Sequence, residues 1–179
     1  MTADPPAPPA PPAGSAPGPV RYRLSAGAGR FRWTLEGAEV AQASWHDHCW
    51  DVRDATTGAV LVSLVGGSYL GRTRIALVDH PGRRAFTFSP GEPVSRSHIG
   101  TVADSAGRPV MVVKADGPTG LHVVDRAGRV LALTSRHGGP GPGYDVLVLP
   151  AAAGIGAPVV LGLVLALELL RAGALRSVA

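Results

Sequence analysis

Cysteine is almost absent from this sequence, since Cys49 is the only one among 179 residues. A single cysteine excludes a disulfide within the chain, so no covalent cross-link supports the fold. The first residues also lack a basic segment followed by an apolar run, the pattern of a secretory signal. Both absences predict a reducing, cytoplasmic location.

Lysine is nearly absent as well, because Lys114 is the only one among 17 basic residues and the rest are arginines. The formal net charge is +4 and the pI is about 10.0. Acidic residues are spread among the arginines, so no basic stripe indicates a nucleic-acid partner. The guanidinium fork suits phosphate, and a mildly basic surface favours an anionic phospholipid, a membrane surface or an acidic protein partner. A solvated arginine surface without a specific role is the alternative.

Pro, Ala and Gly make up nearly all of residues 1–19. Such a stretch cannot bury a core and favours extended, solvated backbone, so we expect a disordered tail. Its Pro-x-x-Pro spacings, such as Pro5 to Pro8, are compatible with a ligand of proline-recognising domains, and a spacer is the simpler interpretation. The rest of the chain divides into one domain over residues 20–172 and a short tail over residues 173–179.

From Val20 onward, apolar and polar residues alternate with period two, which is typical of strands that bury one face. Between the apolar runs, an Asp is followed by a Gly at four points. This pattern predicts tight hairpins at Asp54–Gly58, Asp79–Gly82, Asp104–Gly107 and Asp125–Gly128. Counting the runs predicts about twelve strands, at residues 20–25, 30–36, 39–44, 48–53, 59–65, 72–78, 83–88, 98–103, 108–114, 119–125, 129–135 and 143–149.

An antiparallel sheet of this length must curl or close to protect its edges. Closure of about twelve strands leaves a lumen that has to be filled. The predicted fold class is therefore all-β, a closed antiparallel barrel, and the apolar segment after Pro150 is the candidate filling.

The segment Ala157–Arg171 is predicted to be a helix, with Pro158 in its first turn and Arg171 in its last. Valine and leucine fall on every side, as in a helix that is either fully buried or in a membrane. About 15 residues, or roughly 22 Å, are short for a span. We therefore expect a central helix inside the barrel. The alternative is a tail-anchored membrane protein with a cytoplasmic β domain and a C-terminal transmembrane helix.

Short strands joined by Asp-x-x-Gly hairpins, then a strand with Tyr144-Asp145-Val146, then a final apolar helix, resemble the tubby C-terminal-like superfamily. Within it, the chain is most similar to the LURP-one-related and phospholipid scramblase-like branch, over about residues 20–172. The resemblance implies a twelve-stranded barrel threaded by its C-terminal hydrophobic helix. It also implies phospholipid binding, because tubby domains bind phosphoinositides through basic residues. This chain lacks the cysteine-rich and acidic calcium segments of animal scramblases, so lipid scrambling and calcium dependence are not implied.

The string Trp45-His46-Asp47-His48-Cys49-Trp50 is the most unusual in the sequence. His46 and His48 would share one face of a strand as a metal pair, but no further ligand stands at a diagnostic spacing. His48 beside Cys49 is expected to lower the thiol pKa, yet a nucleophile also needs an orienting group and an oxyanion pocket. We therefore expect no metal, no cofactor and no enzymatic activity, with a metal-dependent or cysteine enzyme as a further alternative.

Two glycine-rich segments, at residues 66–68 and 138–143, lack the Lys-Ser/Thr of a phosphate loop and are predicted to be barrel loops. Arg136 and His137 border the second segment and are candidate anion contacts.

The candidate lipid- or anion-binding set consists of Arg72, Arg74, Arg83 and Arg84. Alternation is expected to place Arg72, Arg74 and Arg84 on the outer face, and a hairpin of residues 72–78 and 83–88 would cluster the guanidiniums. A solvated strand face is the alternative. The function predicted is that of a non-enzymatic binding domain. It would associate reversibly with anionic phospholipid headgroups or a protein partner, in the cytoplasm or at the periphery of a membrane.

Overall fold

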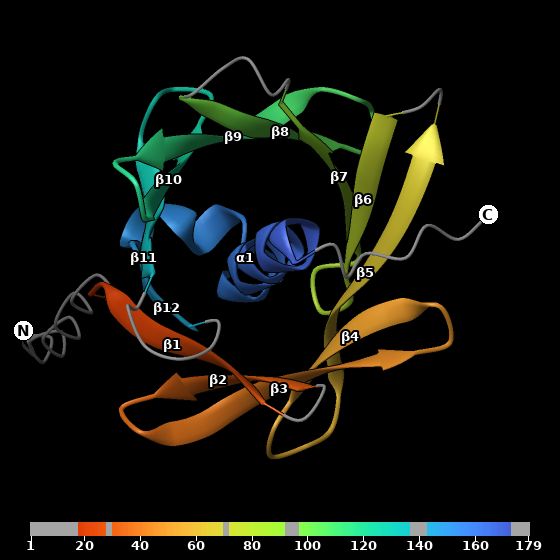
Figure 1. The fold of residues 1–179 in the computed structure, drawn as a ribbon, viewed down its shortest axis with the longest axis vertical. Helices are drawn as coiled ribbons and strands as arrows, with labels where there is room; N and C mark the ends of the chain where they lie inside the picture. Colours follow the sequence, from red (N-terminus) through yellow and green to blue (C-terminus); the bar gives the residue numbers. More distant parts are fainter. Residues whose placement is uncertain (1–17, 28–29, 70–71, 92–96, 137–142, 173–179) are drawn as a thin grey trace, which may run out of the picture.

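The computed structural model describes residues 18–27, 30–69, 72–91, 97–136 and 143–172. Twelve antiparallel strands form a closed barrel around one α-helix, which confirms the predicted fold class (Figure 1). The strands are β1 (Val20–Gly27), β2 (Arg30–Leu35), β3 (Ala38–His46), β4 (Cys49–Asp54), β5 (Val60–Tyr69), β6 (Arg72–Asp79), β7 (Arg84–Pro90), β8 (His98–Asp104), β9 (Pro109–Asp116), β10 (Gly120–Asp125), β11 (Val130–Arg136) and β12 (Gly143–Val148).

Each strand pairs with its neighbours in the sequence, and the barrel closes where β1 pairs with β12 from Val20↔Val148 to Ser25↔Gly143. Closure gives each of the described strands a partner on both sides, so none of them has a free edge that could recruit another chain. Inward and outward residues alternate as the sequence indicated, with Leu24, Trp33 and Val62 among the buried positions.

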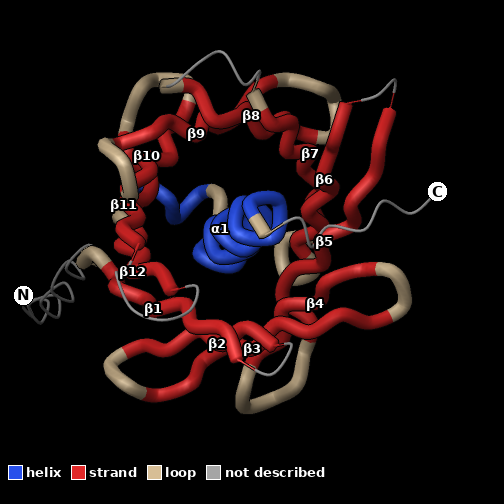
Figure 2. Tube along the Cα trace, in the orientation of Figure 1, coloured by secondary structure: helices blue, strands red, loops and turns tan. Residues whose placement is uncertain are grey.

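After β12, a 3-10 turn (Pro150–Gly154) reverses the chain into α1 (Ala157–Arg171), which runs back through the barrel (Figure 2). The predicted bounds of the helix are confirmed, and every residue from Val159 to Leu169 is buried. A Cβ added at Gly162 would stand 2.7 Å from Cγ1 of Val62, so a glycine lets α1 lie against β5.

The position of α1 decides between the two interpretations of the apolar segment. The helix that the alternative assigned to a bilayer lies among the inward side chains of the strands. Within the ranges described above, no helix is both long and apolar enough to cross a membrane. The predicted tails are residues 1–19 and 173–179, and except for Gly18 and Pro19 they lie outside the described residues.

The two ends of the barrel differ in chemistry, because consecutive strands alternate in direction. The four predicted Asp–Gly hairpins are all present, and they lie together at one end, which we call the Asp–Gly end. In all four, Oδ1 of the aspartate accepts from backbone N–H groups of the turn. The donors are Thr56 and Thr57 for Asp54, Gly82 for Asp79, Ala106 and Arg108 for Asp104, and Ala127 and Arg129 for Asp125. The opposite end, where even-numbered strands begin and α1 finishes, is called the Arg171 end.

Candidate functional site: the Arg171 end of the barrel

The predicted hairpin of β6 and β7 is confirmed, with Ile75 opposite Phe88 and Asp79 opposite Arg84. The predicted clustering of its arginines is wrong. Arg72 and Arg74 lie at the start of β6, whereas Arg83 and Arg84 lie at the turn. Arg74 stands five positions before Asp79, or about 17 Å along the strand. The four guanidiniums are therefore divided between the two ends of the barrel.

Arg84 differs from the prediction in its orientation as well. It is in phase with the buried Phe86 and therefore faces inward, not outward. Its Nε and Nη2 lie 3.0 and 2.8 Å from Oδ2 of Asp79, whose side chain is 5% exposed. Nη1 donates to the carbonyl of Gly154 at 2.7 Å, and Nη2 donates to that of Ile155. Arg84 thus ties the turn before α1 to the wall and has few donors left for a ligand.

At the Asp–Gly end, most of the positive charge is neutralised by short ion pairs. The Arg and Asp partners lie 2.7 to 2.9 Å apart in Arg53–Asp51, Arg84–Asp79, Arg108–Asp104 and Arg129–Asp125. In three of these four pairs the aspartate belongs to a hairpin, and the arginine lies at or just before the start of the strand that follows. A guanidinium held in this way is poorly placed to recruit an anion from solution.

The Arg171 end carries arginines that lack such partners. Arg30 begins β2, Arg72 begins β6 and Arg136 ends β11, and all three are exposed. Among the residues that are described, none of the three is within ion-pair distance of a carboxylate. Uncompensated guanidiniums on one rim are the arrangement that attracts phosphate or carboxylate groups.

An exposed tryptophan lies on the same rim. Trp45 is 40% exposed near the tip of the β3–β4 hairpin, which is a large value for an aromatic residue. Its ring packs edge-on against Trp50, with centroids 6.0 Å apart, and Trp50 packs in turn against Phe31. A tryptophan that is packed on one side and solvent-exposed on the other is typical of interfaces, where its ring makes apolar contacts and its N–H forms a hydrogen bond.

A pocket of about 310 Å³ opens at the Arg171 end beside the last turn of α1. Its apolar side is formed by Ile99, Ala115, Pro118, Leu121 and Leu167, and its polar side by Arg136, Tyr144 and Arg171. These residues come from β8, β9, the β9–β10 turn, β10, β11, β12 and α1. The pocket is therefore assembled from five neighbouring strands, β8 to β12, and the end of the helix.

The polar side of the pocket is organised by one buried acid. Glu168 is 1% exposed, and its two carboxylate oxygens accept from Nε and Nη2 of Arg171 at 3.0 and 2.6 Å. The hydrogen bond to Glu168 raises the pKa of Arg171. Burial raises the pKa of Tyr144, and the negative charge of Glu168 and a hydrogen bond to it raise it further. Tyr144 and Arg171 are thus fixed by Glu168, while Arg136 supplies the charge that is not compensated.

Contrary to what the alternation had indicated, His46 and His48 do not share one face of a strand. The structure places His46 at the end of β3, and Asp47 and His48 in a tight turn with positive φ values of 42° and 67°, not along one strand face. Nε2 of His46 lies 3.0 Å from Oδ2 of Asp47. In the described portion of the chain, no group of three or more His, Cys, Asp or Glu side chains is placed to hold a metal ion.

The expected activation of Cys49 is also contradicted. Partial burial and the neighbouring Asp51 raise the pKa of the Cys49 thiol to about 11. The thiol donates to the carbonyl of His46 at 3.1 Å and to Oδ1 of Asp51 at 3.4 Å. Since the thiolate is the nucleophile, this thiol is unreactive near neutral pH.

A polar network on the outer wall of the barrel was not predicted from the sequence. Oγ of Ser63 lies 2.6 Å from Oδ1 of Asp51 and 2.9 Å from Nε2 of His80, and Arg53 binds Oδ2 of Asp51. Burial opposes the ionised form of Asp51, but these hydrogen bonds and the charge of Arg53 lower its pKa. The carboxylate holds the serine and not the histidine, so the order of a catalytic triad is absent and the network joins β4 to β5 and to the β6–β7 turn.

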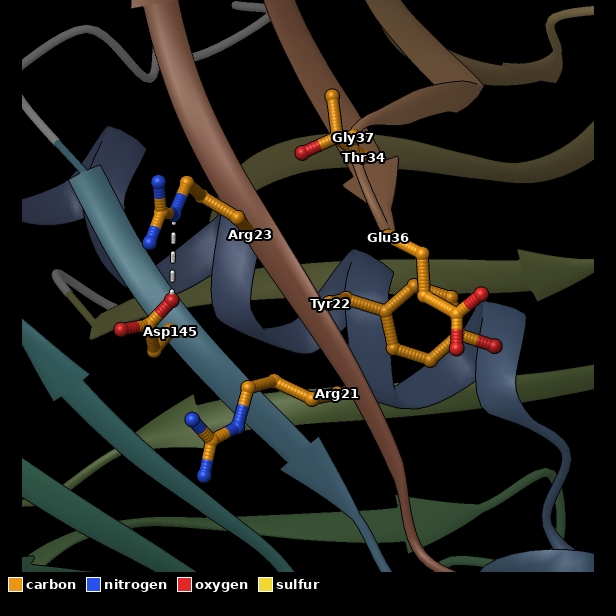
Figure 3. Close-up of a pocket in the computed structure, with 7 residues that line it drawn as sticks. All are labelled: Arg21, Tyr22, Arg23, Thr34, Glu36, Gly37 and Asp145. Carbon is orange, nitrogen blue, oxygen red and sulfur yellow. Dashed lines mark hydrogen bonds and ion pairs between the residues drawn. The ribbon is translucent and has the colours of Figure 1, made fainter.

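A second hollow, of about 260 Å³, lies by β1 and is lined by Arg21, Tyr22, Arg23, Thr34, Glu36, Gly37 and Asp145 (Figure 3). In Figure 3, Arg21 and Arg23 project over β12 on one side of β1, whereas Tyr22 and Glu36 lie on the other side. Nε of Arg23 is 3.4 Å from Oδ1 of Asp145. The groups do not converge, and two carboxylates offset two arginines, so this hollow is a weaker anion site than the Arg171 end.

Comparison with known proteins supports the fold and leaves the function open. No family model matches the chain, and no curated protein matches it. A crystal structure of the Arabidopsis thaliana protein AT5G01750 is similar, with a TM-score of 0.58 and 17% sequence identity. The match covers 83% of this chain and 93% of that one. At this identity the likeness shows the fold alone, and a barrel of twelve strands around a helix fits the tubby-like fold that the sequence resembles.

Proposed function

We propose that this chain is a non-enzymatic binding domain that docks reversibly on anionic phospholipid headgroups through its Arg171 end. The observation that carries the proposal is a combination found on the rim at the Arg171 end. There Arg30, Arg72 and Arg136 have no carboxylate partner among the described residues and lie on the same rim as the exposed ring of Trp45. At the Asp–Gly end, Arg84, Arg108 and Arg129 are paired with aspartates, and exposed arginines such as Arg83 and Arg126 have no exposed tryptophan beside them. A basic residue near an anionic bilayer contributes about 1 kcal/mol, so three on one rim give useful but reversible affinity.

The exposed ring of Trp45 supports the same orientation. Tryptophan is enriched at the level of lipid headgroups because its ring is apolar and its N–H can still reach water. Trp45 and the free arginines lie on one rim, so a single approach brings the aromatic ring and the charges to a membrane together.

The resemblance to the LURP-one-related and phospholipid scramblase-like branch supports a lipid ligand, since the superfamily includes phosphoinositide-binding domains. The proposed location is therefore the cytoplasm, with peripheral attachment to a membrane. Of the four arginines in the sequence-based set, only Arg72 and Arg74 lie at the proposed surface. Arg83 lies at the opposite end, and Arg84 is occupied by Asp79 and the turn before α1.

The test is vesicle co-sedimentation of the full chain and two variants that each lose three exposed arginines. One variant is R30A/R72A/R136A at the Arg171 end, and the matched control is R21A/R83A/R126A outside it. We expect salt-sensitive binding to vesicles containing phosphatidylserine or phosphoinositide and none to pure phosphatidylcholine. The first variant should bind on the order of 100-fold more weakly, and the control only slightly.

Two results would reject the proposal. Equal losses in the two variants would mean that general charge, and not the Arg171 end, is responsible. Equal binding to neutral and anionic vesicles, or no binding to either, would exclude anionic lipid as the ligand. A protein partner would then be the remaining candidate.

A further inference from the structure

We infer that the pocket beside the last turn of α1 binds one medium-chain fatty acid, with its carboxylate at Arg136 and Arg171 and its chain along Leu121 and Leu167. The inference rests on the proposed lipid function and extends it from a membrane surface to a single lipid molecule. It concerns a site inside the rim, whereas docking on headgroups uses the rim itself.

The apolar side of the pocket is suited to a hydrocarbon chain. Ile99 and Leu121 are partly buried and pack against the core, and Leu167 of α1 is 9% exposed. Ala115 lies opposite Leu121 in the β9–β10 pairing, and its small side chain leaves room at this point. A chain laid on these residues would remove apolar surface from water, at roughly 25 cal/mol per Å².

The polar side of the pocket is suited to a carboxylate. Arg136 is exposed and is not in an ion pair with any described residue. Arg171 has five N–H donors. It donates to Glu168 through Nε and Nη2 and also interacts with Tyr144, while its side chain stays 46% exposed. Glu168 offsets the charge of Arg171 and fixes its position, so Arg136 supplies the net positive charge for the ligand carboxylate, and Arg171 adds N–H donors that Glu168 does not use.

The size of the pocket selects the class of lipid. A volume of about 310 Å³ is at the lower limit for ligand pockets. A water molecule occupies about 30 Å³ of liquid, so the pocket holds on the order of ten heavy atoms. Octanoate has that size, whereas a phospholipid with two chains does not fit. An acetate-sized anion would leave the apolar side empty.

The experiment is isothermal titration calorimetry of octanoate into the full chain. Two ligand controls separate the contributions of charge and chain: 1-octanol lacks the carboxylate, and acetate lacks the chain. We expect octanoate to bind and both controls to bind at least tenfold more weakly. If acetate binds as tightly as octanoate, the site is a simple anion site. If 1-octanol binds as tightly, it is a non-specific apolar surface. Either result overturns the inference.

Two variants locate the site. R136A removes an exposed side chain that the fold does not need, and it should weaken octanoate about tenfold or more. A115L fills the apolar side and should abolish binding, while thermal unfolding verifies that the variant is folded. R21A, outside the pocket, is the control and should bind like the parent. Unchanged affinity in R136A places the ligand elsewhere and overturns the inference.

The same proteins distinguish this inference from the proposed function. A115L keeps the rim arginines, so it should still sediment with anionic vesicles. If vesicles bind and octanoate does not, the pocket inference fails alone. If octanoate binds to the parent and not to A115L, while no vesicle binds, the surface proposal fails alone.

Discussion

At the scale of single residues, Cys49 shows how a neighbouring side chain overrides sequence proximity. His48 precedes it in the chain and was expected to favour the thiolate, but the group in contact with Sγ is the carboxylate of Asp51. Partial burial comes first among the causes that raise the thiol pKa to about 11, and the hydrogen bond and charge of Asp51 come next. A negative neighbour stabilises the protonated form, so Cys49 is a packing residue at neutral pH.

Cys49 should therefore react slowly with iodoacetamide in the folded protein. The alkylation rate should rise with pH toward a midpoint near 11. The chain unfolded in urea should instead show the ordinary midpoint of about 8.5. In D51N the midpoint should fall but stay above the unfolded value, because burial remains. A midpoint at or below 8.5 in the folded parent would show that the thiol is activated after all.

At the scale of secondary structure elements, strands, turns and helix were predictable from local patterns. Period-two alternation located all twelve strands, Asp–Gly pairs located four hairpins, and an apolar segment after Pro150 located α1. The same alternation, counted back from Phe86, already places Arg84 inward, so that signal was present in the sequence. The predicted hairpin also separates Arg72 from Arg83, because Arg72 lies at the start of the first strand and Arg83 lies in the turn at its end.

Other features of the site could not be predicted from local patterns. The pocket combines Ile99, Leu121, Tyr144 and Leu167, which meet only because strands β8 to β12 curve around the end of the helix. The pair of Glu168 and Arg171 has helical spacing, but its burial against Tyr144 depends on where α1 stops inside the lumen. Pairwise spacing in the sequence carries no information on either fact.

Arg84→Ala tests the connection between the wall and the helix. The substitution removes the partner of the buried Asp79 and two donors to the carbonyls of Gly154 and Ile155. We expect a loss of about 2 kcal/mol in the free energy of unfolding, measured by urea denaturation. The buried carboxylate of Asp79 is left unpaired, but the site of the lost Arg84 side chain is partly exposed, so water offsets some of the cost.

Arg83→Ala is the matched control for this measurement. Arg83 is the adjacent residue in the same turn and is exposed, so its loss should change stability by no more than about 0.5 kcal/mol. Equal effects of the two substitutions would mean that the bonds of Arg84 do not hold the helix turn in solution.

At the scale of the whole molecule, the C-terminal helix α1 completes the core of the barrel that the twelve strands form. Tight turns held by aspartates lie at one end, and the pocket, Trp45 and three arginines that have no carboxylate partner among the described residues lie at the other. The helix connects the two ends, because Arg84 holds the carbonyls just before its start and Glu168 and Arg171 in its last turn line the ligand end. Structure and proposed binding site thus depend on the same helix.

Truncation after Pro150 tests this dependence. The shortened chain keeps all twelve strands and loses α1, whose residues from Val159 to Leu169 are buried. Removing one buried leucine such as Leu163 to alanine already costs about 2–5 kcal/mol, against a typical total stability of about 5–15 kcal/mol. Without the helix, the inward faces of the strands become wet, so we expect no cooperative thermal transition by circular dichroism. A chain ending at Ala172 keeps α1 and should melt like the full-length protein. A cooperative transition at a similar temperature in the chain ending at Pro150 would show that the strands fold without α1, and the helix would then not be the core of this barrel.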